Sequence, residues 1–184
     1  MTTTLVLGGT RSGKSRHAED LFREHERVTF VATRPAPDPD ADPELSARVQ
    51  MHQERRPAGW RTEETRDLTR ALLSSRNPVL VDCVPAWVRG QLDDHDLWAD
   101  PAGAKALIDG LADELAVAAQ ALPFEVVLVS EDAGPLSWSD EPRDRLFASL
   151  LADVNCRLSA AANGVHVVMA GRVLDLSSAP VVGR

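Results

Sequence analysis

The stretch Leu5-Val-Leu-Gly-Gly-Thr-Arg-Ser-Gly-Lys-Ser15 decides the fold of this chain. Its first three residues are apolar and predict a short buried strand. The residues that follow match the P-loop pattern G-x-x-x-x-G-K-S, in which backbone amides at the start of a helix bind phosphate oxygens. We therefore expect a nucleoside triphosphate to bind here. The alternative is a glycine-rich turn between a strand and a helix that matches the pattern by chance.

Each part of this pattern has a separate task. Gly8 and Gly13 permit backbone angles that other residues disfavour. Lys14 supplies a mobile positive charge to the β and γ phosphates, and the Ser15 hydroxyl is a ligand for the Mg²⁺ that accompanies a polyphosphate. The residues that we expect around the phosphates are Gly8, Gly9, Thr10, Arg11, Ser12, Gly13, Lys14 and Ser15.

Short apolar segments alternate with segments of helical periodicity along the rest of the chain. Strands are predicted over 5–7, 28–32, 78–82, 125–129 and 165–169, and helices over about 14–26, 44–55, 64–75, 84–93, 101–122 and 141–162. This order predicts an α/β protein with a three-layer, P-loop NTPase-like fold and a mostly parallel central sheet.

The domain organisation follows from this pattern. We expect a single P-loop nucleotide-binding domain over residues 1–176 and a flexible C-terminal tail over residues 177–184. Residues 34–43 hold four prolines and three aspartates, and therefore predict a loop.

Composition limits the classes of partner. The 184 residues carry a formal net charge of −8, which argues against nucleic acid, since such binding relies on Lys and Arg. There is no signal-peptide pattern and no apolar segment long enough for a membrane span, so we expect a cytoplasmic protein. Cys83 and Cys156 lack the spacing of a zinc site or of a disulfide framework. We expect two buried thiols.

Two acidic residues follow apolar strands and are candidates to hold Mg²⁺. Asp82 ends the strand predicted over 78–82, where the Walker-B acid of P-loop enzymes lies. The alternative is that Asp82 caps the following helix. Glu131 follows the strand predicted over 125–129 and is the second candidate; its alternative is a solvated acid on a loop.

His52 lies on a predicted helix, four residues after Arg48 and therefore on the same face, and Arg55 and Arg56 follow it. An imidazole nitrogen suits attack on phosphorus while neighbouring guanidinium groups hold the oxygens. The alternative is an ordinary surface histidine, with the arginines paired to acids on a solvated face. The acids within reach would be Glu44, Glu54 and Glu63.

Three segments go beyond what phosphate binding requires. They are Gly8-Gly-Thr-Arg-Ser-Gly-Lys-Ser-Arg-His-Ala-Glu19, then Arg48-Val-Gln-Met-His-Gln-Glu-Arg-Arg-Pro57 with Trp60-Arg-Thr-Glu63, and Val79-Leu-Val-Asp-Cys83 with Trp87. Together they resemble the bifunctional adenosylcobinamide kinase and adenosylcobinamide-phosphate guanylyltransferase family of cobalamin synthesis. The resemblance runs nearly from end to end.

The resemblance implies a two-step activity. The first step phosphorylates the aminopropanol hydroxyl of adenosylcobinamide from GTP or ATP. In the second, the histidine at the position of His52 carries GMP from GTP as a phosphoramidate and passes it to adenosylcobinamide phosphate, giving adenosylcobinamide-GDP. The resemblance also implies a homo-oligomer, a trimer, with sites near subunit boundaries.

These arguments together give one set of expected site residues. The catalytic residues are His52 and Lys14, and the Mg²⁺ ligands are Ser15 and Asp82. Besides the P-loop, the expected nucleotide-binding residues are Arg48, Arg55, Glu63 and Asp82.

Departures from the family pattern gather in the later half of the chain. Pro85 and Gly90 stand where Thr and Asn are usual, and Ala148-Ser149 replaces an Arg-Asp pair. The segment 130–141 keeps only the glutamate and one glycine of the pattern. Because the acceptor or the guanine would bind near these loops, two alternatives stay open. One is a P-loop kinase or nucleotidyltransferase for another small-molecule alcohol, and the other is a non-catalytic nucleotide-binding paralogue.

Overall fold

Strand β1, which precedes the P-loop, lies inside a seven-stranded sheet with the order β3-β2-β4-β5-β1-β6-β7. The computed structural model describes residues 2–35 and 40–182, without the side chains of Leu45, Arg48 and Pro135. The strands are β1 (Thr3–Gly8), β2 (Thr29–Ala32), β3 (Arg61–Glu64), β4 (Val79–Asp82), β5 (Val126–Ser130), β6 (Gly164–Met169) and β7 (Arg172–Asp175).

All neighbouring strands from β3 to β6 pair in parallel, and only β7 is antiparallel, to β6. The helices are α1 (Lys14–Leu21), α2 (Pro43–Glu54), α3 (Leu68–Ser74), α4 (Val84–Asp94), α5 (Pro101–Ala121) and α6 (Pro142–Ala161), with a 3₁₀ helix η1 (Gly134–Trp138). The predicted α/β class and mostly parallel sheet are confirmed.

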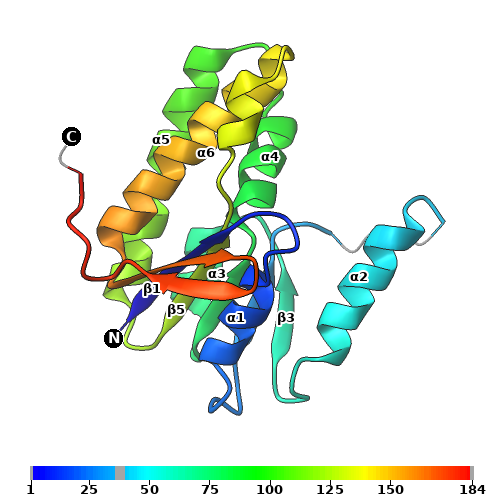
Figure 1. The fold of residues 1–184 in the computed structure, drawn as a ribbon, viewed down its shortest axis with the longest axis vertical. Helices are drawn as coiled ribbons and strands as arrows, with labels where there is room; N and C mark the ends of the chain where they lie inside the picture. The colour runs from blue at the N-terminus through cyan, green and yellow to red at the C-terminus, as the bar shows by residue number, and fades with distance from the viewer. Residues whose placement is uncertain (1, 36–39, 183–184) are drawn as a thin grey trace.

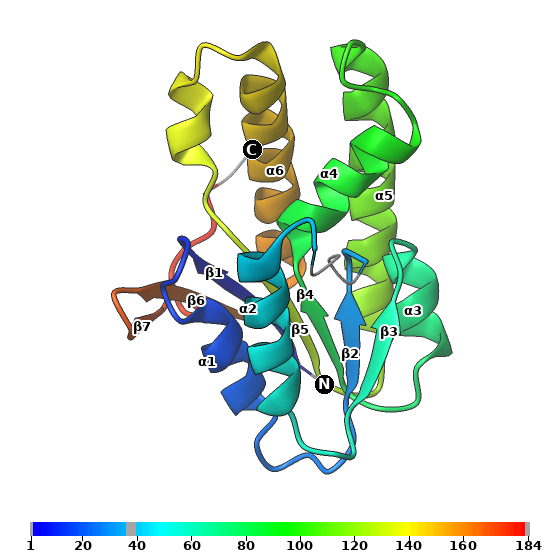
Figure 2. The same cartoon turned by 90° about the vertical axis from the view of Figure 1, so that its right-hand side faces the viewer.

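Both faces of the sheet are buried under helices. Leu5 belongs to an apolar cluster with residues of α3, α4, α5 and α6, whereas its neighbour Val6 belongs to a second cluster with Ala18 and Phe22 from the α1 side. Consecutive residues of β1 thus enter opposite cores, as side chains of a strand alternate. Figures 1 and 2 show the result, with α1 and α2 on one face of the sheet and α3 to α6 on the other.

Strand β3 was not expected, because the sequence predicts a helix from about residue 64. Its residues Arg61–Glu64 are polar and mostly exposed, so they carry no apolar signal, but they pair with β2 at the edge of the sheet. The following helix begins only at Leu68, because the Asp67 side chain accepts a hydrogen bond from the Arg70 backbone and caps it.

Three further expectations need correction. Helix α1 ends at Leu21 rather than near residue 26. The next residue, Phe22, is the C-cap of the helix and is fully buried in the core. Strand β7 follows the last of the predicted strands, 165–169, in residues to which no strand was assigned. Its turn contains Ala170 and Gly171, which both have positive φ angles. Cys156 is exposed rather than buried, because it lies on the outer face of α6.

The ends and the proline-rich loop are only partly described. Residues 36–39 of the predicted loop and residues 183–184 of the predicted tail lie outside the described residues. The backbone N–H of Val165 donates to the Ser177 hydroxyl, so the chain is still attached to β6 at the start of the tail. The domain boundary at 176 stays a prediction. In the described part of the chain, no helix has both the length and the apolar character of a membrane span.

Candidate functional site

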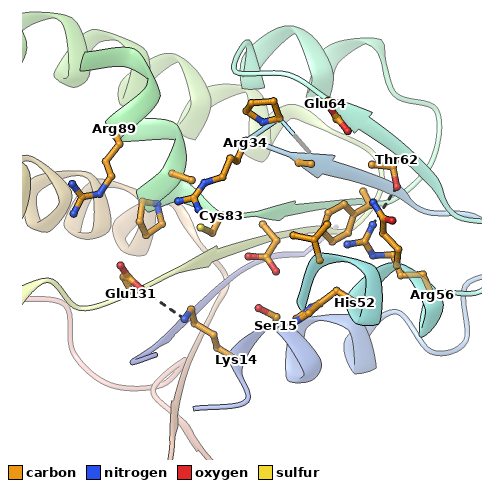
Figure 3. Close-up of a pocket in the computed structure, with 18 of the residues that line it drawn as sticks. Lys14, Ser15, Arg34, His52, Arg56, Thr62, Glu64, Cys83, Arg89 and Glu131 are labelled. Carbon is orange, nitrogen blue, oxygen red and sulfur yellow. Dashed lines mark hydrogen bonds and ion pairs between the residues drawn. The ribbon is translucent and has the colours of Figure 1, made fainter. Parts of the chain in front are cut away.

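A pocket of about 290 Å³ opens where the carboxyl ends of the parallel strands meet. This edge is where ligands bind in open α/β sheets. Its walls combine the P-loop with the ends of β2, β3, β4 and β5 and with two helices, α2 and α4 (Figure 3). The pocket residues with the clearest chemistry are Lys14, Ser15, His52, Asp82, Arg89 and Glu131.

The backbone of the P-loop requires its glycines. A Cβ atom at Gly8 would lie 2.5 Å from Ser12 Oγ and 2.6 Å from the Val168 carbonyl oxygen, so no larger residue fits. Gly13 has a φ of 97° at the N-cap of α1, where no side chain caps the helix. The Lys14 amide donates to the Ser12 hydroxyl at 3.3 Å, and the amides of Ser15 and Arg16 that follow keep their capacity to bind an anion.

Lys14 is held inside this loop. Its side chain is 10% exposed, its Nζ atom donates to the Gly9 carbonyl at 3.2 Å, and the Glu131 carboxylate lies 3.8 Å away. Glu131 is therefore a wall of the pocket rather than a solvated loop acid. Glu131 directly follows β5, so its contact with Lys14 shows that the end of β5 lies beside the expected phosphate site.

Asp82 and Ser15 face the same pocket. Asp82 does not cap α4, because the N-cap is Cys83 and no side chain caps this helix. Among the described residues, no hydrogen bond or ion pair engages the Asp82 carboxylate. A hydroxyl and a carboxylate are oxygen ligands of the kind that Mg²⁺ prefers, so the residues fit this ion. The described part contains no group of three or more His, Cys, Asp or Glu that could hold a metal.

His52 is brought to the P-loop by α2. It lines the pocket together with Lys14 and Ser15, and it also lines a second hollow of about 500 Å³ beside the P-loop, where Arg11, Ser12 and Gly13 lie. The imidazole is thus within the same cavity system as the residues expected to bind a triphosphate. No filled core separates them.

The Nδ1 atom of His52 meets an acid and an arginine. It lies 3.5 Å from Glu19 Oε1 and 3.2 Å from Arg55 Nη2, and Arg55 Nη2 also donates to Glu19 Oε2 at 3.0 Å. Glu19 Oε1 is buried, with no hydrogen-bond partner among the described residues. A guanidinium only donates, so the Arg55 contact belongs to the tautomer in which Nδ1 is the acceptor. In the other tautomer, a proton on His52 Nδ1 would point to the buried Glu19 Oε1 and leave Nε2 with its lone pair.

Arg55 does not form the ion pair with Glu44, Glu54 or Glu63 that was considered as the alternative from the sequence. Arg55 pairs with Glu19 of α1, not with an acid of its own region, whereas it is Arg11 that pairs with Glu44, in an exposed contact of 2.9 Å. The side chain of Arg48 lies outside the described part of the structure.

Glu63 is not among the residues that line either cavity, whereas Thr62 and Glu64 line the main pocket. The reason is the alternation of side chains along β3. The role predicted for Glu63 is thus unsupported by the geometry, and its neighbour Glu64 is the acid on the pocket side.

Arg56 forms part of the pocket wall beside β2. Its guanidinium lies 3.3 Å from the centre of the Phe30 ring, and Nη1 donates to the Thr62 hydroxyl at 3.2 Å. Burial lowers the pKa of Arg56, although Glu19 and Asp82 oppose this effect. Its Nε atom is buried without a partner among the described residues. Because Nε is buried, a ligand would contact this guanidinium through its Nη atoms.

Cys83 follows Asp82 in the pocket, but it is not a nucleophile. Burial raises its pKa to about 12, and the neighbouring Asp82 charge acts in the same direction. The thiol is therefore protonated at neutral pH.

Comparison with known proteins decides the family. A family model described as cobinamide kinase / cobinamide phosphate guanyltransferase matches residues 4–176. This chain belongs to that family. The family resemblance and the transferase class predicted from the sequence are thereby confirmed, and the chain is a cobinamide kinase and guanylyltransferase of cobalamin biosynthesis.

Individual relatives agree with this family assignment. The bifunctional adenosylcobalamin biosynthesis protein CobU of Salmonella typhimurium is 36% identical over 91% of this chain and 95% of its own length. CobP of Pseudomonas aeruginosa, with the same description, is 38% identical over 71% of each chain. Among solved structures, the P4 protein from bacteriophage phi6 in complex with ADP aligns with a TM-score of 0.40 and 18% identity, over 94% of this chain and 52% of that one.

Several residues that line the pocket of this kinase and guanylyltransferase, or that contact His52 from behind as Glu19 does, were not assigned a role from the sequence. Glu19 lies in a quoted motif and follows Ser15 by one helical turn, which is the signal that could have found it. Arg34, Phe30, Glu64 and Arg89 carried no local signal, because only the tertiary fold brings them to the pocket.

Proposed function

We propose that this enzyme transfers GMP through a covalent guanylyl-His52 intermediate, after phosphorylating adenosylcobinamide at the P-loop. The observation that supports this proposal most strongly is that His52, Lys14 and Ser15 line the same pocket. A nucleophile next to a phosphate-binding loop can react with the bound nucleotide without a long displacement.

In the kinase step, the aminopropanol hydroxyl of adenosylcobinamide attacks the γ phosphorus of GTP or ATP. The bond to the β–γ bridging oxygen breaks, and a nucleoside diphosphate leaves. Lys14 and the amides of the P-loop offset the negative charge on the phosphoryl oxygens. We assign Glu131 as the acceptor of the hydroxyl proton, because its carboxylate faces Lys14 at 3.8 Å.

In the transfer step, His52 Nε2 attacks the α phosphorus of GTP and pyrophosphate leaves. A phosphate oxygen of adenosylcobinamide phosphate then attacks the same phosphorus, the P–N bond breaks, and adenosylcobinamide-GDP forms. Glu19 orients the imidazole by accepting from Nδ1–H, and Arg55 holds Glu19 in place. In the neutral imidazole, a proton on Nδ1 leaves the Nε2 lone pair for attack, and the contact with Glu19 fixes the direction of the ring.

Mg²⁺ would be held by Ser15 and Asp82 together with phosphate oxygens. When bound, the ion neutralises charge on the polyphosphate and favours departure of the leaving group. The free carboxylate of Asp82, which neither caps α4 nor pairs with a described residue, supports this assignment.

The side of the pocket formed by β2, β3 and α2 suits a guanine base. Arg56 offers N–H donors for the O6 and N7 acceptors of guanine, as in the usual pairing of Arg with this base. The Glu64 carboxylate offers acceptors for the guanine N1–H and N2–H donors. Both side chains line the pocket next to His52.

The proposal is tested with GTP labelled at the α phosphate. In the presence of Mg²⁺ the protein should acquire an acid-labile, base-stable label that is absent from His52→Ala, because a P–N bond shows this pattern and a serine ester does not. Adenosylcobinamide phosphate should discharge the label. A label that adenosylcobinamide phosphate leaves in place would instead favour another acceptor, and a chain that binds GTP without becoming labelled would not use a guanylyl-histidine.

A further inference from the structure

Arg89 is a second candidate for binding an anion in this pocket, and it does not belong to the P-loop. It lies on α4, and its guanidinium carbon is 3.7 Å from the centre of the Phe147 ring on α6. Phe147 is fully buried in the main core. The ring is therefore a fixed platform that determines where the guanidinium can lie.

Stacking leaves the hydrogen-bonding capacity of Arg89 unused. A guanidinium that lies over a ring uses its face, while its five N–H donors remain in the plane and can bind a phosphate in a bidentate way. Among the described residues, no carboxylate lies within ion-pair distance of Arg89 or of Arg34. Arg34 lines the same pocket from the end of β2, and Figure 3 shows the two arginines on one side and Ser15 and His52 on the other.

The nucleotide has its own phosphate-binding groups on the opposite side of the pocket. These are the P-loop amides and Lys14, which follow β1, whereas Arg34 follows β2 and Arg89 follows β4. Strand β5 lies between β1 and β4 in the sheet. The two arginines thus line the pocket from strands other than the one that carries the P-loop.

We infer that Arg89, assisted by Arg34, binds the phosphomonoester of the acceptor during guanylyl transfer. This inference rests on the proposed function and assigns the acceptor site within it. A phosphomonoester carries a charge of about −1.5 to −2 at pH 7. Two guanidinium groups that have no carboxylate partner within the described part of the chain match such a dianion. The acceptor group of the kinase step is an uncharged hydroxyl, so Arg89 distinguishes the two acceptor groups and acts in the second step only.

The experiment separates loading of the enzyme from its discharge. Wild type and Arg89→Gln are first labelled from α-labelled GTP and freed of nucleotide. Discharge is then followed in a single turnover at increasing concentrations of adenosylcobinamide phosphate. Arg89→Gln should raise the half-saturating acceptor concentration by about 10- to 100-fold, the range expected for a lost charge-assisted hydrogen-bond pair.

Loading with GMP and the KM for adenosylcobinamide in the kinase step should not change in Arg89→Gln. Arg89→Lys keeps the charge but loses the planar, stacked donor geometry. Its half-saturating acceptor concentration should lie between those of wild type and Arg89→Gln. Arg76→Gln is the matched control, because Arg76 is exposed and lies between α3 and β4 at the opposite edge of the sheet.

Two results would overturn the inference. One is an unchanged half-saturating acceptor concentration in a folded Arg89→Gln protein. The other is slower loading from GTP with normal discharge, which would assign Arg89 to the nucleotide. If wild type acquires no label, the proposed guanylyl-His52 intermediate is wrong, whatever the role of Arg89. Equilibrium dialysis of adenosylcobinamide phosphate, read from corrinoid absorbance, then still decides whether Arg89→Gln weakens acceptor binding.

Discussion

His52 Nδ1 lies 3.5 Å from Glu19 Oε1, and this contact joins α2 to the helix that begins at the P-loop. Glu19 follows Ser15 by four residues, so both side chains lie on one face of α1. The proposed nucleophile and the proposed Mg²⁺ ligand are therefore positioned by the same helix. A shift of α2 that broke this contact would also move the imidazole away from the phosphates.

The first prediction concerns Glu19. Glu19→Gln removes the acceptor charge at His52 Nδ1, and a misdirected imidazole should form the guanylyl adduct about a hundredfold more slowly. The measurement is the rate of labelling from α-labelled GTP. Glu24→Gln, at an exposed site after the same helix, is the control. Equal labelling rates in Glu19→Gln and wild type would remove Glu19 from the mechanism.

The second prediction concerns Asp82. Asp82→Asn should raise the Mg²⁺ concentration that gives half-maximal labelling by about 10- to 100-fold, since a ligand charge is lost. Titration of Mg²⁺ at fixed GTP measures this value. Asp20→Asn is a suitable control, because Asp20 pairs with Arg23 on the surface. An unaltered Mg²⁺ requirement would point to Glu131 as the acid that matters.

The third prediction compares two glycines of the P-loop by stability alone. Gly8→Ala should lower the free energy of unfolding by about 1–3 kcal/mol, as overpacking does, because its new methyl group would meet Ser12 Oγ and the Val168 carbonyl. Gly9→Ala should have little effect on thermal unfolding, since nothing lies within 4 Å of a Cβ atom there. Equal melting temperatures of the two variants would contradict the described loop.

The fourth prediction concerns the two thiols. Cys83 has a pKa of about 12 because it is buried beside Asp82, so it has almost no thiolate at neutral pH. Cys156 is exposed on α6. Iodoacetamide at neutral pH should therefore alkylate Cys156 and leave Cys83 unmodified in the folded protein, as peptide mass spectrometry would show. Comparable modification of both would mean that the pocket wall opens.

The fifth prediction concerns pH. Burial first, and then His166, lower the pKa of His17 below 6.5, so the unfolded chain binds this proton more tightly than the folded one. Stability from this group is thus present above pH 6.5 and is lost as pH falls below that value. The melting temperature of His17→Gln should fall less steeply with acidification than that of wild type. Equal dependence of the melting temperature on pH in the two proteins would exclude His17 as a source of the acid destabilisation.

The elements that the sequence predicted well are those with strong local patterns. The P-loop, the acid at the end of β4 and the helix that carries His52 all follow from spacing and strand ends. Strand β3 could not be found in this way, because Arg61-Thr-Glu-Glu64 has no apolar alternation and becomes a strand only by pairing with β2.

The arginine-lined walls of the pocket could not be predicted either. The pairs Arg89–Phe147 and Arg56–Phe30 join residues that are far apart in the chain, so no local pattern reports them. The two adjacent glutamates of β3 cannot be told apart from the sequence, since only the direction of the strand decides that Glu64, and not Glu63, lines the pocket. The role of Glu63 stays a prediction. The expected trimer stays a prediction, which light scattering of the purified protein would test.

Peptide mapping by mass spectrometry tests the central claim most directly. After incubation with GTP and Mg²⁺, the peptide that contains His52 should gain the mass of one GMP group, and His52→Ala should gain none. An unmodified His52 peptide from a protein that still phosphorylates adenosylcobinamide, or a GMP group attached to another residue, would contradict the account.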